Sequence, residues 1–204
     1  MVDVSPHHPY PALKPPQLVL LRHGETAWSK SGQHTGITDI ALTEEGERRA
    51  RELQPVLARR DFGLVLSSPR RRAVTTAELA GFAGRLELTE DLAEYDYGAY
   101  EGLTSAEIER IRPGWDLWRD GAPQGETSAE VRVRVERVIA RAQTVLDGGH
   151  DVLAVAHGHV LRALAAAWID LPPEGGGRLV LSTAGLAELG HEHDNRVIDL
   201  WNAA

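Results

Sequence analysis

Short apolar runs, each followed by polar sequence, constrain most strongly what this chain can fold into. Two of them, residues 17–21 and 152–156, have the length and composition of strands that are buried on both faces. Such strands are typical of parallel sheets, because helices cover both faces of those sheets. The sequence predicts strands near 17–21, 64–66, 86–88, 152–156, 179–181, 185–189 and 197–200.

Helical segments separate these runs. Thr43, with Glu44 and Glu45 behind it, is typical of a helix start, and Thr127 with Glu130 forms a capping box that opens a long helix. Strands that alternate with helices predict an α/β fold with a mostly parallel, doubly wound sheet covered on both faces. The expected helices run from 43 toward 60, from 70 to about 80, from 127 to about 146 and from about 160 to 168.

Length and composition favour one ordinary globular domain. The chain has 204 residues, of which 42% are apolar and 25% charged, and five of its eleven prolines lie within residues 1–16. We therefore expect a proline-rich tail at 1–16 and a single domain at 17–204. The net charge of -8 argues against nucleic acid and anionic membrane surfaces as partners. Without cysteine, a signal-peptide pattern or an apolar run of roughly 18 residues, we expect a cytoplasmic protein with no disulfide.

Residues 94–126 differ in composition from the rest of the chain. They contain five of the eleven aromatic residues, together with many acidic residues and several glycines. We interpret this segment, called the excursion below, as a cover over a site. The alternative is a small satellite core, which is the commoner use of aromatic side chains. The aromatic residues are Tyr95, Tyr97, Tyr100, Trp115 and Trp118.

Two of the expected strands end in a histidine that is followed by glycine. The strand at 17–21 leads into His23-Gly24, and the strand at 152–156 leads into His157-Gly158. Ligands bind where parallel strands end, so both histidines are expected at one site. The glycines let backbone amides approach an anion closely. A neutral imidazole can attack phosphorus once cations neutralise the phosphate, which makes phosphoryl transfer the expected chemistry.

Two arginines and a glutamate complete the expected site. Arg22 precedes His23, and Arg72 lies where the second strand feeds its helix; their planar guanidinium groups suit phosphate. These cations should lower the pKa of His23 and keep it neutral, whereas His157 should donate to phosphate oxygens. Glu94 begins the excursion and is the expected acid for the leaving alkoxide, since partial desolvation favours a protonated carboxyl group.

Neighbouring residues compete for these roles. Arg70 and Arg71 compete with Arg72, because consecutive arginines at a helix start are often a solvated face. Asp91, Asp96 and Glu101 are alternatives to Glu94. A metal cluster is a weaker hypothesis, since its histidines occupy turns; they would be His157, His159, His191 and His193.

Taken together, these motifs resemble the histidine phosphatase superfamily, which includes cofactor-dependent phosphoglycerate mutases and many phosphatases. The resemblance covers about residues 17–190, in the family's order. It implies a three-layer α/β/α sandwich with no required metal or other cofactor, and it favours a homodimer. The motifs that carry it are Leu21–Thr26, Ser67–Pro69 with Arg72-Ala73, Glu94 with Tyr97-Gly98 and Glu101-Gly102, and Ala156–His159.

The resemblance also implies roles for individual residues. His23 corresponds to the phosphorylated histidine and Glu94 to the proton donor. Arg22, Arg72 and His157 correspond to the phosphate pocket. Further residues fall at positions that line the substrate pocket in relatives, namely Thr35, Gly36, Tyr97, Gly158 and His159.

The same resemblance separates two reactions. Mutases of the family carry a long insertion after the glutamate, with a lysine and a paired arginine that hold a second acidic group. Between 94 and 130 this chain has only Arg110, Arg112 and Arg119 and no lysine. Its shorter, more open insert should admit water to a phosphohistidine, which favours a phosphatase over a mutase.

One further segment resembles a particular branch of the family. Residues 28–36, which include Ser29 and Lys30, are similar to a branch that contains acid phosphatases and sedoheptulose-bisphosphatase-like enzymes. Both side chains are candidates for binding substrate. For Lys30 the choice lies between a contact with a distal anionic group and an ordinary surface position.

The predicted function is hydrolysis of small soluble phosphorylated metabolites, such as sugar phosphates, through a phosphohistidine on His23. The alternatives are a cofactor-dependent phosphoglycerate mutase and a catalytically silent module that binds phosphorylated ligands. The silent module is disfavoured because all five catalytic positions are filled. Since Glu94 must start protonated, activity should be highest on the acid side of neutrality.

Overall fold

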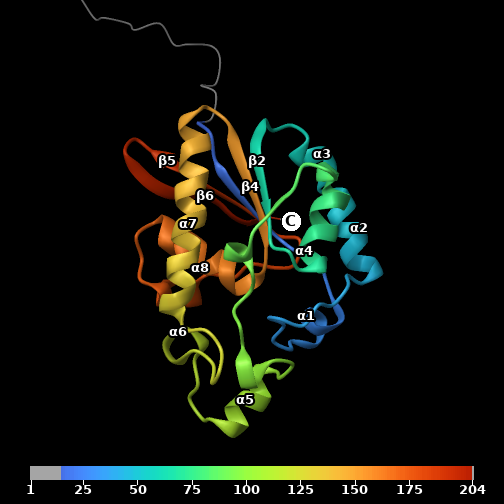
Figure 1. Cartoon of the computed structure of the whole chain (residues 1–204), viewed down its shortest axis with the longest axis vertical. Helices are drawn as coiled ribbons and strands as arrows, with labels where there is room; N and C mark the ends of the chain where they lie inside the picture. Colours follow the sequence, from blue (N-terminus) through green and yellow to red (C-terminus); the bar gives the residue numbers. More distant parts are fainter. Residues whose placement is uncertain (1–14, 204) are drawn as a thin grey trace, which may run out of the picture.

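The computed structural model describes residues 15–203, and its centre is one six-stranded mixed sheet (Figure 1). The strand order is β3-β2-β4-β1-β5-β6. Apart from its last two residues, the tail predicted at 1–16 lies outside the described residues. The strands are β1 (Leu18–Arg22), β2 (Phe62–Ser67), β3 (Glu87–Leu88), β4 (Asp151–Ala156), β5 (Leu186–Glu192) and β6 (Asn195–Ala203).

The part of the sheet that carries the predicted site is parallel. Strands β3, β2, β4 and β1 are parallel neighbours; β5 pairs antiparallel with β1, and β6 pairs antiparallel with β5. In the β1–β4 pair, Leu18 lies opposite Val152 and Arg22 lies opposite Ala156. Both strands therefore end at the same edge, and the α/β fold with a mostly parallel sheet is confirmed.

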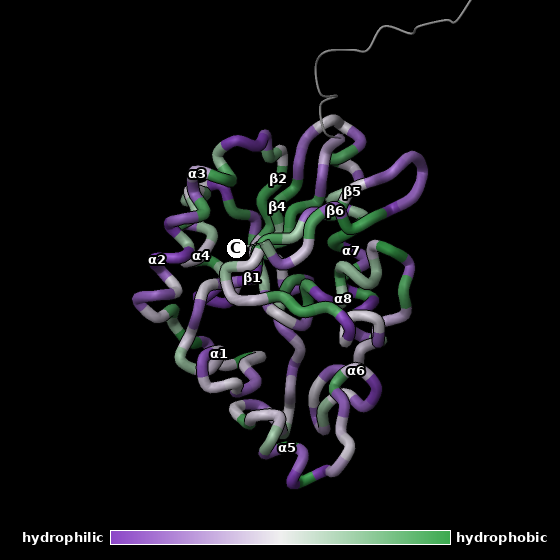
Figure 2. The backbone as a smooth tube through the Cα atoms, turned by 180° about the vertical axis from the view of Figure 1, so that it is seen from behind, coloured by the Kyte–Doolittle hydropathy of each residue, from purple (hydrophilic) through white to green (hydrophobic). Residues whose placement is uncertain are grey.

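The sheet lies between two layers of helices. Successive side chains of a strand point to opposite faces, so Leu18 and Leu20 belong to one core and Val19 and Leu21 to the other. In Figure 2 the hydrophobic colour gathers on the central strands, whereas the outer helix α2 is largely hydrophilic. One layer contains α7 (Ser128–Asp147) and α8 (Gly158–Trp168), and the other contains α2 (Glu44–Glu52), α3 (Gln54–Leu57) and α4 (Arg71–Ala77).

The long helix α7 follows its sequence pattern closely. Thr127 accepts a hydrogen bond from the Glu130 backbone N–H, and the Glu130 carboxylate accepts one from the Thr127 N–H, as the capping box predicts. The predicted apolar stripe is buried against the sheet. Its members are Val131, Val135, Val138, Ile139, Ala142 and Leu146.

Two predicted helices are interrupted. The helix expected from 43 toward 60 is divided into α2 and α3 at Leu53, next to Pro55, which has no N–H to donate to the preceding turn. The helix expected from 70 to about 80 ends as α4 at Ala77 and continues as a π-helical segment, Glu78–Phe82. Gly81 in that segment has a φ of 102°, a conformation that glycine adopts readily.

The strand predicted near 179–181 was wrong. Val180 is 69% exposed, and the backbone carbonyls of this segment bind side chains instead of a neighbouring strand. The Leu181 carbonyl accepts from Arg22 Nη1 at 2.6 Å, and the Val180 carbonyl accepts from Trp201 Nε1 at 2.6 Å. An apolar run of three residues did not reveal this use of its backbone.

The excursion lies beyond the ends of the parallel strands (Figure 1). Its aromatic side chains pack together: the ring centre of Tyr95 lies 5.7 Å from that of Trp118, and Tyr100 lies 5.3 Å from Trp115. Tyr95, Tyr97, Tyr100 and Trp118 are buried in the same core as Leu18 and Leu20, so they do not form a separate satellite core. Glu94 and Tyr97 of this segment also line the cavity described below. The short helices at this end are α1 (Ala27–Ser31), α5 (Ser105–Ile111) and α6 (Leu117–Asp120).

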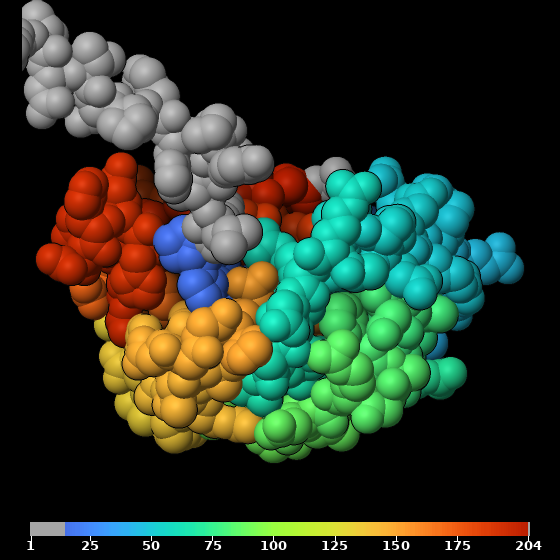
Figure 3. Space-filling view, turned by 90° about the horizontal axis from the view of Figure 1, so that it is seen from above, coloured from blue at the N-terminus to red at the C-terminus, as the bar shows by residue number. Residues whose placement is uncertain are grey.

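The opposite end of the sheet, where β1 and β4 begin, is covered by polar contacts. Figure 3 views this end and shows the first described residues, in blue, between the orange segment near residue 150 and the red C-terminal strands. Gln17 is buried there; its backbone N–H donates to Asp151, and its side chain contacts Asp199 and Arg60. Within residues 15–203, no helix is both long and apolar enough to cross a membrane.

Candidate active site

A cavity of about 190 Å³ lies at the edge where β1 and β4 end. Residues that follow these two strands form part of its wall, and residues from the excursion form another part. Four residues predicted for the site are not among those that line it: Lys30, Gly36, Arg72 and His157. Eight predicted residues do line it: Arg22, His23, Ser29, Thr35, Glu94, Tyr97, Gly158 and His159.

His23 has one ring nitrogen available for chemistry. Its backbone N–H donates to the Ala156 carbonyl at 2.9 Å, which joins the ends of β1 and β4. Its Nδ1 lies 2.7 Å from the Gly24 carbonyl oxygen, and a carbonyl can only accept, so Nδ1 carries the proton and Nε2 carries the lone pair. Burial, and then the charges of Arg22 and Arg72, lower the pKa of His23 well below its usual value. The imidazole is therefore held neutral.

The glycines after the two histidines are required by close packing. A Cβ on Gly24 would lie 2.5 Å from the Gly46 carbonyl oxygen, so α2 can approach the loop only because no side chain is present. The sequence suggested that the backbone amide of Gly24 could bind an anion. In the structure this N–H donates to Thr76 Oγ1 instead. A Cβ on Gly158 would meet the Arg22 guanidinium at 3.2 Å. This glycine leaves room for the cation.

His157 and Arg72 lie directly behind His23. The ring centres of His157 and His23 are 5.1 Å apart. Arg72 Nε donates to His157 Nδ1 at 3.0 Å, so the ring proton of a neutral His157 is on Nε2, which faces Ser68 Oγ at 2.7 Å. Burial, and then the Arg72 charge, lower the pKa of His157 well below its usual value. His157 is thus neutral, and its ring proton is directed at Ser68. The expected donation from His157 to phosphate oxygens stays a prediction.

Arg72, rather than its neighbours, is the arginine that turns toward the site. It is fully buried, and its guanidinium donates to the Thr35 carbonyl at 2.9 Å and to the Thr38 carbonyl at 3.0 Å. Arg71 is exposed, and Arg70 lies 3.5 Å from Glu90. Arg72 therefore fixes the loop that carries Thr35 and places positive charge behind His23.

Arg22 lines the cavity and has an unused donor. Its Nη1 donates to the Leu181 carbonyl, which fixes the guanidinium, but its Nε is buried and has no hydrogen-bond partner within the described residues. A buried donor without an acceptor is costly, and an oxyanion in the cavity would satisfy it. The arrangement suits a phosphate group beside His23.

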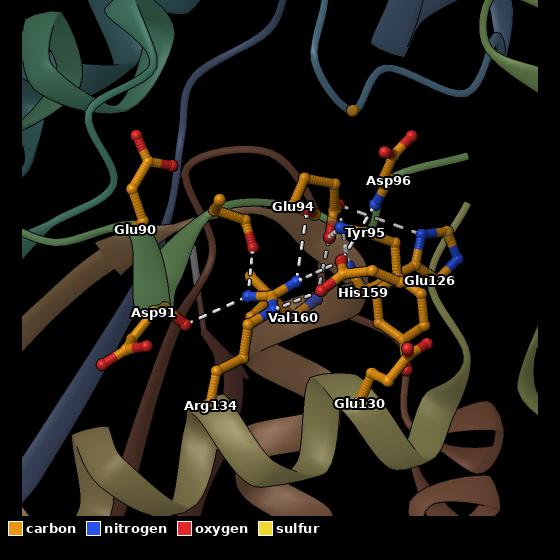
Figure 4. Close-up of polar contacts among 12 residues, drawn as sticks. Glu90, Asp91, Glu94, Tyr95, Asp96, Glu126, Glu130, Arg134, His159 and Val160 are labelled. Carbon is orange, nitrogen blue, oxygen red and sulfur yellow. Dashed lines mark hydrogen bonds and ion pairs between the residues drawn. The ribbon is translucent and has the colours of Figure 1, made fainter. Parts of the chain in front are cut away.

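Glu94 is held at the start of α8. Its Oε1 accepts from the N–H groups of Tyr95 and Val160 at 3.1 and 2.9 Å, and its Oε2 accepts from the His159 N–H at 3.0 Å (Figure 4). These bonds join the excursion to α8 and leave the 8% exposed Glu94 side chain on the cavity wall. A carboxyl group in this position can exchange a proton with a bound ligand.

The three competing carboxylates have structural partners elsewhere. Glu101 accepts from the N–H groups of Gly36 and Thr38, so it shapes the loop behind the cavity. Asp91 pairs with Arg137, and Asp96 accepts from the Gly98 N–H. Of the four candidate carboxylates, Glu94 is the one that lines the cavity.

Residues 18–204 match the family model described as histidine phosphatase superfamily, branch 1. The chain belongs to this superfamily. It is 43% identical to an acid phosphatase of Mycobacterium tuberculosis, over 88% of this chain and 89% of the relative. It is 36% identical to sedoheptulose 1,7-bisphosphatase of Saccharomyces cerevisiae, over 76% of this chain and 68% of the relative.

Solved structures agree with this family. The structure of an open reading frame from Mycobacterium tuberculosis superposes with a TM-score of 0.89 at 41% identity, and the match covers 93% of this chain and 98% of the other. The family and these relatives identify the chain as a phosphatase. They also confirm that this histidine phosphatase has the phosphoglycerate mutase-like α/β fold that the motifs implied.

Tyr97, which is buried, and His159, which is partly exposed, form a pair on the wall of the cavity. The Tyr97 hydroxyl lies 2.6 Å from His159 Nδ1. Burial, and then the Glu94 charge, raise the pKa of Tyr97, so the phenol stays protonated. Burial, and then the Arg162 charge, lower the pKa of His159, so its ring stays neutral. The pair contributes polar groups without adding net charge.

Lys30 lies apart from the cavity. Its side chain is 71% exposed, and its ammonium nitrogen is 3.7 Å from Glu25 Oε1. Ser29 lines the cavity, and its hydroxyl and backbone N–H form the capping box of α1 with Thr26. Gly36 contributes its carbonyl to Arg72 and has no room for a Cβ, which would lie 2.3 Å from the Tyr95 carbonyl oxygen. The functional roles of these residues stay predictions.

Several functional candidates were missed by sequence reasoning. Ser68 lies within hydrogen-bond distance of His157 Nε2, and Arg134 donates to the backbone carbonyl of Glu94. Gly32, Gln33 and His34 also line the cavity; they lie in the segment 28–36 that we singled out, but no role was predicted for them. Ser105 and Arg162 line the cavity without belonging to any motif that we singled out. The spacing of Arg162 after the second His-Gly, one helical turn beyond His159, is a signal that could have found it.

Within residues 15–203, no group of three or more His, Cys, Asp or Glu side chains is arranged to hold a metal ion. His191, a member of the alternative metal cluster, packs against Trp168 with ring centres 5.2 Å apart. His157 is bonded to Arg72 and Ser68. The histidines that the metal hypothesis grouped are therefore used separately.

Proposed function

We propose that this phosphatase hydrolyses small phosphorylated metabolites through a phosphohistidine on His23. The observation that carries the proposal is the state of that ring: a neutral imidazole whose Nδ1–H is tied to the Gly24 carbonyl, so that the Nε2 lone pair is available in the cavity. A neutral nitrogen between cations can approach a phosphate dianion that would repel an anionic nucleophile.

In the first step, His23 Nε2 attacks phosphorus and the bond from phosphorus to the ester oxygen breaks. Glu94 gives its proton to the departing oxygen, and the product is an alcohol. Arg22, through its free Nε, and the charge of Arg72 stabilise the phosphoryl oxygens in the transition state.

In the second step, water attacks the phosphorus of the phosphohistidine and the N–P bond breaks. Glu94, now a carboxylate, takes a proton from the attacking water, and inorganic phosphate leaves. His23 returns to its neutral state with Nδ1 still bonded to Gly24. The cycle needs only water as co-reactant.

The excursion supports hydrolysis over mutase chemistry. Two of its three arginines are engaged outside the cavity: Arg112 lies 3.5 Å from Asp120, and Arg119 lies 2.8 Å from the same residue. Neither lines the cavity, and Arg110 does not line it either. A cation cluster for retaining a bisphosphate intermediate is therefore not supplied by these residues.

The substrate class rests on the size of the cavity and on the relatives. The cavity of about 190 Å³ and its aromatic surroundings suit a small metabolite such as a sugar phosphate. The relatives named above act as an acid phosphatase and on sedoheptulose 1,7-bisphosphate, which supports this class. The homodimer and the cytoplasmic location stay predictions.

Trapping the intermediate tests the proposal. Wild-type protein quenched during turnover of a ³²P-labelled substrate should carry acid-labile label, whereas His23→Ala should carry none and lose about 10⁴-fold or more in kcat. His150→Ala, on the surface, is the matched control and should keep both. Hydrolysis that survives in His23→Ala would contradict the proposal. Faster formation of 2-phosphoglycerate than of free phosphate, from 3-phosphoglycerate with a bisphosphoglycerate primer, would identify a mutase.

A further inference from the structure

Arg162 lies where two cavities meet. It is on α8, one turn after His159, and it lines both the cavity that contains His23 and an outer cavity of about 460 Å³. The two cavities also share His34, Ser105 and His159. A ligand that places its phosphate beside His23 can therefore extend toward Arg162.

The Arg162 guanidinium is fixed in place without a carboxylate. Its Nε donates to the Gly176 carbonyl at 3.0 Å, and its Cζ lies 4.9 Å from the ring centre of Trp118. Gly176 permits this approach, because a Cβ there would lie 2.4 Å from the Trp118 ring. Within residues 15–203, no Asp or Glu oxygen lies within 4.0 Å of the Arg162 nitrogens. The orientation is set by a neutral carbonyl and an aromatic face.

The remaining donors of Arg162 face accessible space. Its Nη1 and Nη2 form no hydrogen bond with the described residues, yet neither is among the buried side-chain atoms that lack a partner. Burial lowers the pKa of Arg162 in spite of the raising influence of Glu94, so the charge is held in a partly desolvated place. An unpaired charge of this kind is costly, and an anion that binds to it recovers part of that cost.

We propose that Arg162 binds a second acidic group, a phosphate or a carboxylate, carried by the leaving alcohol of the substrate. This inference rests on the proposed function and narrows its substrate class to phosphomonoesters that carry a second acidic group. The planar guanidinium can bind either group through two parallel hydrogen bonds from its terminal nitrogens. The exposed Lys30, which the sequence suggested for this role, is paired with Glu25 outside the cavity.

The charges around the outer cavity limit where that group can lie. Glu109 and Asp116 line the outer cavity, and both carboxylates accept backbone hydrogen bonds of the excursion. They repel an anion that enters the outer cavity beyond Arg162. The second acidic group is therefore placed at the boundary between the cavities, which sets an upper limit on the length of the substrate.

The test compares substrates that differ by one acidic group. One pair is 3-phosphoglycerate and glycerol 3-phosphate, which differ in a carboxylate; the other is fructose 1,6-bisphosphate and fructose 6-phosphate, which differ in a phosphate. In Arg162→Gln, kcat/KM for the substrate with two acidic groups that the wild type prefers should fall about tenfold to a hundredfold, or about 1.4 to 2.7 kcal/mol. For its partner with one acidic group, kcat/KM should change less than about threefold.

Two further variants separate charge from packing. Arg162→Lys keeps the charge but loses the planar pair of donors, so it should recover part of the preference. Arg141→Gln is the control for an exposed cation that pairs with Glu87 and lines neither cavity, and it should leave both values unchanged. An equal fall for both members of a pair in Arg162→Gln would assign Arg162 a purely structural role, and no fall for either would remove it from the substrate site.

A binding measurement keeps this inference separate from the proposed function. In a His23→Ala background, calorimetry should show that Arg162→Gln weakens binding of the preferred ligand with two acidic groups at least tenfold. The affinity for its partner with one acidic group should be unchanged. If the wild type hydrolyses none of the probes, the proposed function fails, but the binding comparison still decides on Arg162. Equal affinities of the two ligands for protein with and without Arg162 would overturn the inference.

Discussion

The inner and outer ends of this active site are built by different kinds of structure. At the inner end, His23 and His157 follow neighbouring parallel strands, and their rings are bonded to the Gly24 carbonyl and to Arg72. At the outer end, Arg162 is held by a loop carbonyl and an aromatic ring of the excursion. The inner positions depend on sheet register, and the outer ones depend on loops packed over one another.

This difference suggests that the two ends of the site have different functions. In the proposed reaction, groups at the strand ends act on the phosphoryl group, which every substrate shares, so changes there should affect all substrates alike. Groups at the outer end are proposed to contact the leaving alcohol, so changes there should affect substrates unequally. Glu94 belongs to both ends, since it starts on the excursion and is bonded to the first turn of α8. A substitution of Glu94 is therefore the most direct test of this difference in function.

The largest expected effect that depends on the leaving group comes from Glu94→Gln. An amide cannot give its proton to a departing alkoxide, so kcat for an alkyl phosphate should fall about 10²- to 10⁴-fold. For p-nitrophenyl phosphate the fall should be much smaller, because that leaving group departs as a stable phenolate. Steady-state kinetics on both substrates checks this, with thermal melting to verify the fold. Equal losses would show that Glu94 is not the acid.

A smaller effect is expected from Arg134, which holds the Glu94 segment from outside the cavity. Arg134, on α7, donates to the carbonyls of Asp91, Ala93 and Glu94, and its guanidinium pairs with Glu126 (Figure 4). It is only 8% exposed. Arg134→Gln frees these carbonyls and lets the carboxyl group shift, so kcat should fall about tenfold to a hundredfold.

The control for this prediction lies on the same helix. Arg137 binds Asp91 through an exposed ion pair, so Arg137→Gln should change kcat little. Arg134→Gln should also reproduce the leaving-group dependence of Glu94→Gln in weaker form, which a general loss of stability would not do. A uniform loss for alkyl and aryl phosphates would mean that Arg134 stabilises the fold without positioning the acid.

The inner end was predictable from sequence because each of its parts leaves a local pattern. Apolar runs predict β1 and β4, and a polar residue directly after a buried strand must lie at the sheet edge, which located His23 and His157. Arg72 needed the family spacing, since three consecutive arginines have the same local pattern.

The outer end was not predictable because its contacts join residues that are distant in sequence. Arg134 is 40 residues from the Glu94 carbonyl that it binds, and the helical pattern gives it no distinction from exposed Arg137. Arg162 depends on Trp118, in α6, and on Gly176, in the 3-10 helix Pro173–Arg178, and both are far from it in sequence. The segment near 179–181 was misjudged for the same reason, as its carbonyls serve Arg22 and Trp201. Tertiary contacts of this kind leave no periodic pattern.

The smallest expected effect concerns stability, and it would show that the inner end is held by neutral histidines. The pKa of His157 is lowered by burial and by Arg72, whereas in the unfolded chain it should be about 6.5. Above that pH neither state binds the proton, and stability is fully present. Below it the unfolded chain takes up a proton that the folded protein does not, so the free energy of unfolding should fall by about 1.4 kcal/mol per pH unit for this residue.

Urea unfolding at pH 7.5, 6.5 and 5.5 measures this slope. His157→Gln should lower stability at pH 7.5, because Arg72 loses its acceptor, and should also remove about one proton from the slope below pH 6.5. His150→Gln, at a half-exposed surface position, is the control that changes the histidine count alone. An unchanged slope in His157→Gln would mean that this ring takes up its proton in the folded protein, and a charged ring beside Arg72 could not serve as the neutral donor assigned to it.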